Sequence, residues 1–119
     1  MGFGLSGGSF GNTKGNNPFA NFKKTINKEL QEHHIPDSKH YLQGRSIFKG
    51  TVATAQQLIN EFSGKGQYVT SHKERVDFGQ VIGIFRNKDG SIECETTVGT
   101  IHYGKTGTHI VPANPNSER

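Results

Sequence analysis

Apolar residues in the first half of the chain follow a helical period. After Asn21 they recur every three or four positions among lysines and glutamates, which predicts an amphipathic helix that Pro36 ends. A second helix is predicted after Thr51 and Thr54, two candidate N-caps, and it closes at Gly64 and the glycine two residues later. The expected buried positions are Phe22, Ile26 and Leu30 in the first helix and Ala55, Leu58, Ile59 and Phe62 in the second.

The second half of the chain has a period of two, which is typical of β-strands. Runs of β-branched and aromatic residues predict strands at Gln67–Thr70, Arg75–Phe78, Val81–Arg86, Ile92–Thr97, Thr100–Tyr103 and Thr108–Val111. Asn87–Gly90 and Gly104–Gly107 have the composition of hairpin turns. Helices followed by strands predict an α+β fold, in which the N-terminal helices pack on one face of a meandering C-terminal antiparallel sheet and leave the other face in solvent.

The last predicted hairpin brings two histidines together. If its strands pair about the Gly104–Gly107 turn, His102 lies opposite His109. In an antiparallel hairpin the residue numbers of every facing pair add up to the same total, and the turn fixes that total. Facing residues on one side of a sheet have Cβ atoms about 4.5–5.5 Å apart, so that both imidazoles could contact one small group. Alternation places the neighbouring Ile101 and Tyr103 on the other face, which suits a core.

Two histidines on a solvent-facing surface favour metal-independent cleavage of RNA. That reaction needs a base for the 2′-hydroxyl proton, an acid for the 5′-oxygen, and a cation with hydrogen-bond donors for the phosphorane. Histidine, with an ordinary pKa of about 6.5, can hold either proton role, and the sequence leaves open which of the two is the base. Lys105 supplies a charge at the turn, and the hydroxyl of Thr106 or Thr108 could bind phosphate oxygens. A non-catalytic role for the pair also stays open.

Residues outside the turn are further candidates. His34 lies where the first helix must stop, so that its ring could cap the turn, interact with the helix C-terminus or point into the cleft beside the sheet. Arg45 and Ser46 follow a glycine and could bind substrate phosphate, against the alternative of a solvated loop. Tyr103 could stack on a base, although a half-buried tyrosine is commoner.

Composition narrows the class of protein. The chain has 119 residues and a formal charge of +4, which fits one small domain with a polyanionic partner but also fits many other basic domains. A single cysteine cannot form an internal disulfide, and the spacing of the early histidines is poor for a metal, so that no metal or other cofactor is expected. No apolar run of about 18 residues occurs, and we therefore expect no membrane insertion.

The N-terminal stretch differs in composition from the rest of the chain. Residues 1–19 are rich in Gly, Ser and Asn, which predicts a flexible linker before a domain at residues 20–119. The alternative is a packed N-terminal arm that uses Phe3, Leu5 and Phe10.

Several short motifs together resemble a known family. They are His34-Ile35-Pro36, Gln43-Gly44-Arg45-Ser46, Ile82-Gly83, Ile101-His102-Tyr103 with Lys105, and Gly107-Thr108-His109-Ile110-Val111-Pro112. From about His33 to Ala113 the chain resembles the polymorphic toxin type 50 domain, and the last motif is the specific one. The N-terminal stretch lies outside the resemblance.

The resemblance implies a nuclease toxin. These domains are regarded as members of the barnase, EndoU, colicin and RelE-like nuclease group, which implies an α+β fold and metal-independent endoribonuclease activity that leaves a 2′,3′-cyclic phosphate. It also implies a position at the C-terminus of a larger secreted or phage-associated protein, action in the cytoplasm of a target cell, and neutralisation by a cognate immunity protein. Any export signal is then expected elsewhere on the parent protein.

The family's polar positions fall on residues of the hairpin that the strand register also singles out, and on His34 outside it. They are His34, His102, Lys105, Thr108 and His109, with Thr106 in the turn. The chain departs from the expected pattern at Gly104, where serine is expected, and at Asp37, where glycine is expected. Two other functions stay open, namely a non-catalytic RNA-binding or phage structural module, and a protein-binding domain whose histidines respond to pH.

Overall fold

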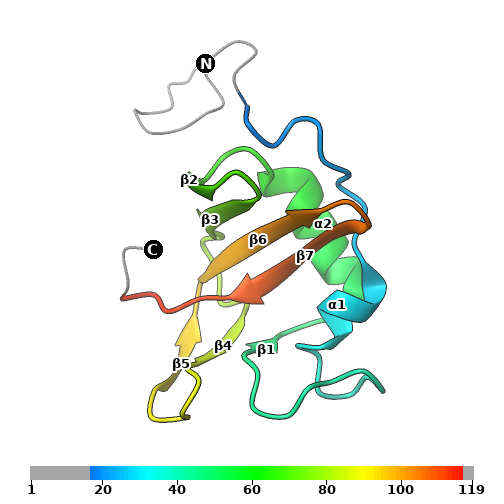
Figure 1. Cartoon of the computed structure of the whole chain (residues 1–119). Helices are drawn as coiled ribbons and strands as arrows, with labels where there is room; N and C mark the ends of the chain where they lie inside the picture. Colours follow the sequence, from blue (N-terminus) through cyan, green and yellow to red (C-terminus); the bar gives the residue numbers. More distant parts are fainter. Residues whose placement is uncertain (1–16, 117–119) are drawn as a thin grey trace.

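The computed structural model describes residues 17–116, which form two helices and seven strands in two antiparallel sheets. In chain order these are α1 (Lys28–Glu32), β1 (Ile47–Phe48), α2 (Val52–Phe62), β2 (Gln67–Thr70), β3 (Lys73–Asp77), β4 (Gly83–Arg86), β5 (Glu93–Thr96), β6 (Val98–Gly104) and β7 (Gly107–Pro112). The mixed content of helices and antiparallel sheets is compatible with the predicted α+β class (Figure 1). No helix within residues 17–116 has the length and apolar character needed to cross a bilayer.

The strands do not form the single meander that was expected. The larger sheet has the order β2-β3-β6-β7, and β3 pairs with β6 from Asp77↔Val98 to Lys73↔His102. The β4–β5 hairpin therefore leaves this sheet and pairs with β1 in a smaller sheet at one end of the molecule (Figure 1). A glycine is needed at Gly83, because a Cβ there would lie 1.9 Å from the backbone oxygen of β1.

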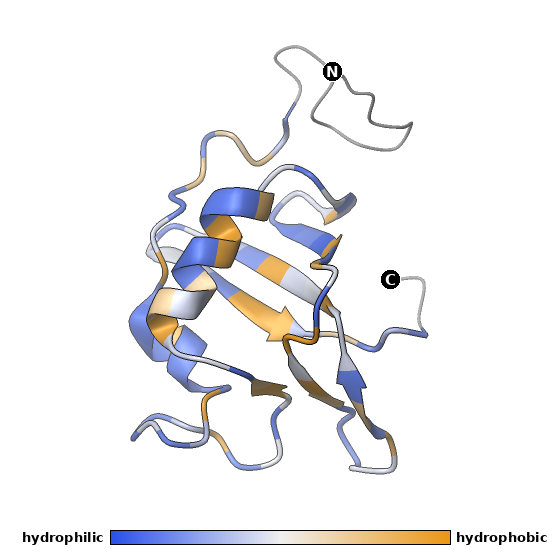
Figure 2. Cartoon of the chain, turned by 180° about the vertical axis from the view of Figure 1, so that it is seen from behind, coloured by the Kyte–Doolittle hydropathy of each residue, from blue (hydrophilic) through white to orange (hydrophobic). Residues whose placement is uncertain are grey.

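The second helix begins where the sequence predicts it. Thr51 is the N-cap, and its hydroxyl accepts a hydrogen bond from the Thr54 N–H at 3.3 Å, while the Thr54 hydroxyl accepts from the Thr51 N–H at 3.1 Å. The helix lies across one face of the larger sheet (Figures 1 and 2) and buries Ala55, Leu58 and Ile59 there. Each buried Leu or Ile side chain contributes roughly 1.5–3 kcal/mol, so that this face holds helix and sheet together.

The first helix is much shorter than predicted. Only Lys28–Glu32 are helical, with Asn27 as N-cap, because the residues before it extend along β7 instead. The Thr108 N–H donates to the Thr25 oxygen at 3.0 Å, and the Asn27 N–H donates to the Thr108 oxygen at 2.9 Å. The close approach requires Gly107, whose φ is +129° and where a Cβ would lie 2.8 Å from the Thr25 oxygen. Pairing with β7 thus overrides the local helical period.

An aromatic residue near the start of the described residues contributes to the core. Phe19 is fully buried, and its ring stacks on that of Tyr103 with centroids 4.7 Å apart. Phe19, the last residue of the predicted linker, therefore packs in the core. The alternative arm with Phe3, Leu5 and Phe10 lies outside the described residues.

Gln31 completes the free edge of the larger sheet. Its fully buried side chain lies beside β7, where Nε2 donates to the Ile110 oxygen at 3.0 Å and Oε1 accepts from the Ile110 N–H at 2.8 Å. The amide satisfies the two backbone groups that a further strand would otherwise pair. Since Ile110 directly follows His109, this contact also holds the strand that carries a candidate site residue.

The substitution Gln31→Met is expected to lower the free energy of unfolding by about 2–4 kcal/mol, because both backbone groups of Ile110 would stay buried without a partner. Chemical denaturation measures this loss. The matched control is Gln57→Met at an exposed position of α2, with an expected change below about 0.5 kcal/mol. A loss at Gln31 no larger than that of the control would contradict the edge-pairing role.

Candidate active site

The β6–β7 hairpin has the predicted register. His102 pairs with His109, and Tyr103 pairs with Thr108, as the numbering of the turn requires. The two imidazole centroids lie 4.9 Å apart, with the rings tilted by 33°. The pair lies on the face opposite the core, since the alternating residue Ile101 is fully buried.

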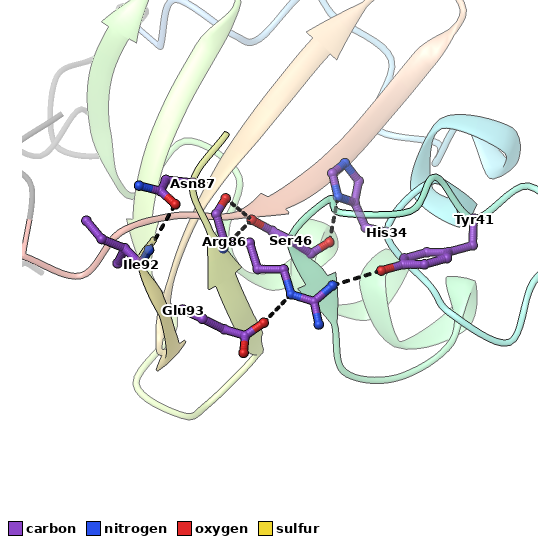
Figure 3. A network of polar contacts seen from close by, with 7 residues as sticks. All are labelled: His34, Tyr41, Ser46, Arg86, Asn87, Ile92 and Glu93. Atoms are coloured by element: carbon purple, nitrogen blue, oxygen red, sulfur yellow. Dashed lines mark hydrogen bonds and ion pairs between the residues drawn. The ribbon is translucent and has the colours of Figure 1, made fainter. Parts of the chain in front are cut away.

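A third histidine joins this pair. The His34 ring stacks on the His109 ring, with centroids 6.1 Å apart and an interplanar angle of 17°. Its Nδ1 lies 2.9 Å from the Ser46 backbone oxygen (Figure 3), and a carbonyl oxygen only accepts hydrogen bonds. A neutral His34 therefore carries its proton on Nδ1, which leaves the lone pair on Nε2 as an acceptor.

The three histidines line one pocket with a volume of about 470 Å³. The other walls come from residues 43–46 before β1, residues 85–88 at the end of β4, and residues 111–112 at the end of β7. This size is within the range of about 300–1,000 Å³ that small-ligand sites occupy. The pocket brings together five of the predicted site residues, which are His34, Arg45, Ser46, His102 and His109.

Burial keeps the histidines of the pocket neutral. Loss of solvation is the main cause that lowers the pKa of His109 to about 3 and that of His102 to about 4, and it also lowers the pKa of His34. Nearby positive groups add to the effect, with the charge of Lys73 acting on His102 and that of Arg45 acting on His34. At neutral pH the free protein therefore presents three uncharged imidazoles, each able to accept a proton.

A network of hydrogen bonds fixes the wall of the pocket beside His34 (Figure 3). The Ser46 hydroxyl accepts from the Arg86 N–H at 2.9 Å and lies 3.3 Å from the Arg86 carbonyl oxygen, to which it donates. The Arg86 guanidinium pairs with Glu93 through Nε and donates to the Tyr41 hydroxyl at 3.1 Å through Nη1. Arg45, which directly precedes Ser46, also lines the pocket. Ser46 therefore has a structural role in the wall of the pocket, because its hydroxyl is already hydrogen-bonded to the backbone of β4.

Comparison with known families agrees with this arrangement of motifs. The sequence model of one family, described as bacterial toxin 50, matches residues 26–112. The chain belongs to the bacterial toxin 50 family. The matched region contains every residue that lines the pocket. No protein with a curated description matches the chain.

The turn residues of this toxin domain lie outside the pocket. Lys105 and Thr106 are exposed at the tip of the hairpin, and neither lines the pocket that holds the histidines. The Thr106 hydroxyl oxygen accepts a hydrogen bond from Asn27 Nδ2 at 3.0 Å. Both side chains are thus near the histidine pair in sequence, but the pocket itself is formed without them.

Two predicted site residues of the toxin domain lie on the wrong face of the sheet for the roles expected of them. Thr108 is fully buried, and its hydroxyl donates to the Lys23 carbonyl oxygen at 2.6 Å. Tyr103 is 3% exposed, and its hydroxyl donates to Glu74 at 2.5 Å. Because strand alternation turns both side chains away from the histidines, Thr108 cannot bind a phosphate there and Tyr103 cannot stack on a base there.

Arg86 and Lys88 line the pocket and were not predicted from the sequence. The sequence predicts this segment as the end of a strand and a hairpin turn, but its place beside the histidines depends on the pairing of β1 with β4.

Within residues 17–116 no group of three or more His, Cys, Asp or Glu side chains is arranged to hold a metal ion.

Proposed function

We propose that this toxin domain is a metal-independent endoribonuclease, which cleaves RNA by attack of the 2′-hydroxyl and leaves a 2′,3′-cyclic phosphate. The observation that carries the proposal is the group of three neutral imidazoles in one pocket, whose lining also includes Arg45 and Arg86. Imidazoles supply the two proton transfers of this reaction, and guanidinium groups stabilise the charge of the phosphorane. The proposal also places the fold in the barnase, EndoU, colicin and RelE-like nuclease group.

His34 is the proposed general base. Its Nδ1–H is held by the Ser46 carbonyl, its Nε2 has a free lone pair in the neutral ring, and its lowered pKa keeps it unprotonated. In the proposed step the 2′-hydroxyl proton passes to Nε2 while the O2′–P bond forms and the P–O5′ bond breaks.

The His102–His109 pair is the proposed source of the proton for the leaving O5′. Both rings are neutral in the free protein, so that one of them must take up a proton when substrate binds. A phosphate anion beside an imidazole favours the charged form and raises its pKa. Arg45 and Arg86, which line the same pocket, are proposed to bind the non-bridging oxygens of this phosphate. Arg86 would do so through Nη2, because its Nε and Nη1 already contact Glu93 and Tyr41.

The biological setting is part of the same proposal. Membership of a bacterial toxin family supports delivery of the domain into a target cell by a larger secreted or phage-associated parent protein. It also supports a cognate immunity protein. Because the pocket wall carries Arg45, Arg86 and Lys88, this partner is proposed to cover the pocket with carboxylates.

Incubation with total cellular RNA in EDTA tests the nuclease proposal. Wild type is expected to fragment the RNA, and the double variant His102→Ala, His109→Ala is expected to cut at least about 10²-fold more slowly. Salt-dependent retention of intact RNA by folded wild type would instead favour the non-catalytic RNA-binding or phage structural module. Equal cutting by both proteins would retain the nuclease and reject this site, and loss of cutting in EDTA would reject the metal-independent mechanism.

A further inference from the structure

The face of the sheet that carries the histidine pair continues onto β3. This strand lies beside β6, on the side away from β7 (Figure 1), with Lys73 paired to His102 and Arg75 paired to Thr100. Glu74, which lies between the two basic residues, is fully buried on the core side. Alternation therefore places Lys73 and Arg75 on the same face as His102, in two successive positions about 6.6 Å apart along the strand.

Both basic side chains act on this face of the molecule. Lys73 lies directly opposite His102 in the β3–β6 register, and its charge is the largest cause after burial of the lowered pKa of His102. Arg75 Nη2 donates to the Asn114 carbonyl oxygen at 3.0 Å, and Asn114 follows the end of β7, so that the guanidinium is held along the sheet. Positive charge thus flanks the histidines on the side away from Arg45.

The proposed general base, His34, is recessed in a small pocket. His34 is only 4% exposed, and the pocket that it lines has a volume of about 470 Å³. A nucleotide within a duplex would have to enter together with its paired and stacked neighbours, whereas an unpaired nucleotide can be inserted alone.

We propose that Lys73 and Arg75 bind phosphates that flank the scissile phosphate, so that the substrate is an unpaired RNA strand running from the pocket across β6 and onto β3. The inference rests on the proposed ribonuclease function and defines the class of RNA for that site. It assigns these two residues to substrate binding and not to the proton transfers, since they lie beyond His102 and outside the pocket.

Binding of a strand that cannot be cleaved tests the subsite without relying on catalysis. The probe is a short all-2′-deoxy single strand, whose Kd is measured against salt concentration for wild type, Lys73→Gln, Arg75→Gln and the control Lys65→Gln. Each lost phosphate contact is expected to reduce the slope of log Kd against log salt by about 0.7. Lys65 is exposed after the end of α2, and its variant is expected to keep the wild-type slope. Unchanged slopes for both β3 variants would overturn the inference.

Cleavage of substrates of two lengths separates this inference from the proposed function. For a long single strand, Lys73→Gln and Arg75→Gln are each expected to raise KM about three- to tenfold. The kcat is expected to change little for Arg75→Gln, whereas Lys73→Gln also removes a charge that acts on His102, so that any change in its kcat is expected to be the same for both substrate lengths. For a dinucleotide, which cannot reach β3, neither variant is expected to change KM, and Lys73→Arg is expected to restore tight binding of the long strand. An equal rise in KM for the long strand and the dinucleotide would overturn the inference while leaving the nuclease intact. Cleavage of a duplex as fast as that of the single strand would do the same. No cleavage by wild type would reject the nuclease, and the slopes would then still decide whether β3 binds phosphates.

Discussion

Replacing His109 with glutamine is expected to slow RNA cleavage by about 10²–10⁴-fold while the protein stays folded. His109 is the middle ring of the three, with the His102 centroid 4.9 Å away on one side and the His34 centroid 6.1 Å away on the other. Glutamine keeps a hydrogen-bonding group of similar reach but cannot carry a proton at neutral pH. Single-turnover rates on one RNA in EDTA, with the melting temperature of each protein, measure the effect.

The matched control is His72→Gln, which changes an exposed histidine in the turn between β2 and β3. Its rate is expected to stay close to that of wild type. If His109→Gln is folded and loses less than about tenfold in rate, the proposed role of the histidine group is contradicted.

The second large effect is a loss of stability in acid that depends on the same ring. Folding lowers the pKa of His109 from 6.5 to about 3, so that below pH 6.5 the unfolded chain binds a proton that the folded protein does not. The stability linked to this neutral ring is complete above pH 6.5 and is lost as the pH falls toward the folded pKa. The expected loss is about 1.4 kcal/mol per pH unit for one such histidine.

Comparison of wild type with His109→Gln isolates this contribution. Between pH 7.5 and pH 4.5 the variant is expected to lose about 2–3 kcal/mol less free energy of unfolding than wild type. Denaturant titrations at several pH values measure the difference, and His72→Gln serves again as the control. Parallel curves for wild type and His109→Gln would show that burial does not hold this ring neutral.

The central hairpin could be predicted because its register is set locally. A short glycine-bounded turn at Gly104–Gly107 leaves one way to pair the strands, and the facing of His102 and His109 follows from their numbers alone. The second helix could be predicted for a similar reason, since Thr51 and the apolar spacing act within one segment. Features of this kind depend on residues close together in the chain.

The rest of the site depends on pairings between distant segments, which local periodicity does not encode. Lys73 lies beside His102 because β3 pairs with β6, and Arg86 faces the pocket because β4 pairs with β1. The first helix was predicted too long for the same reason, since Thr25 pairs with the backbone of β7. The alternation of side chains along the strand correctly indicated that Tyr103 is buried. A strand position on the core face is therefore better evidence for the role of this tyrosine than its ability to stack on a base.

Removal of one 2′-oxygen atom from the substrate tests the central claim most directly. After the cleavage site in a synthetic RNA strand has been mapped, wild type is given the same strand with a single 2′-deoxynucleotide on the 5′ side of that bond, in EDTA. If the 2′-hydroxyl is the nucleophile, the all-ribo strand yields a 2′,3′-cyclic phosphate end and the substituted strand is not cut at that bond. Cleavage of the substituted strand at the same bond, or a product of the all-ribo strand with a 5′-phosphate end, would contradict the mechanism proposed for this toxin domain.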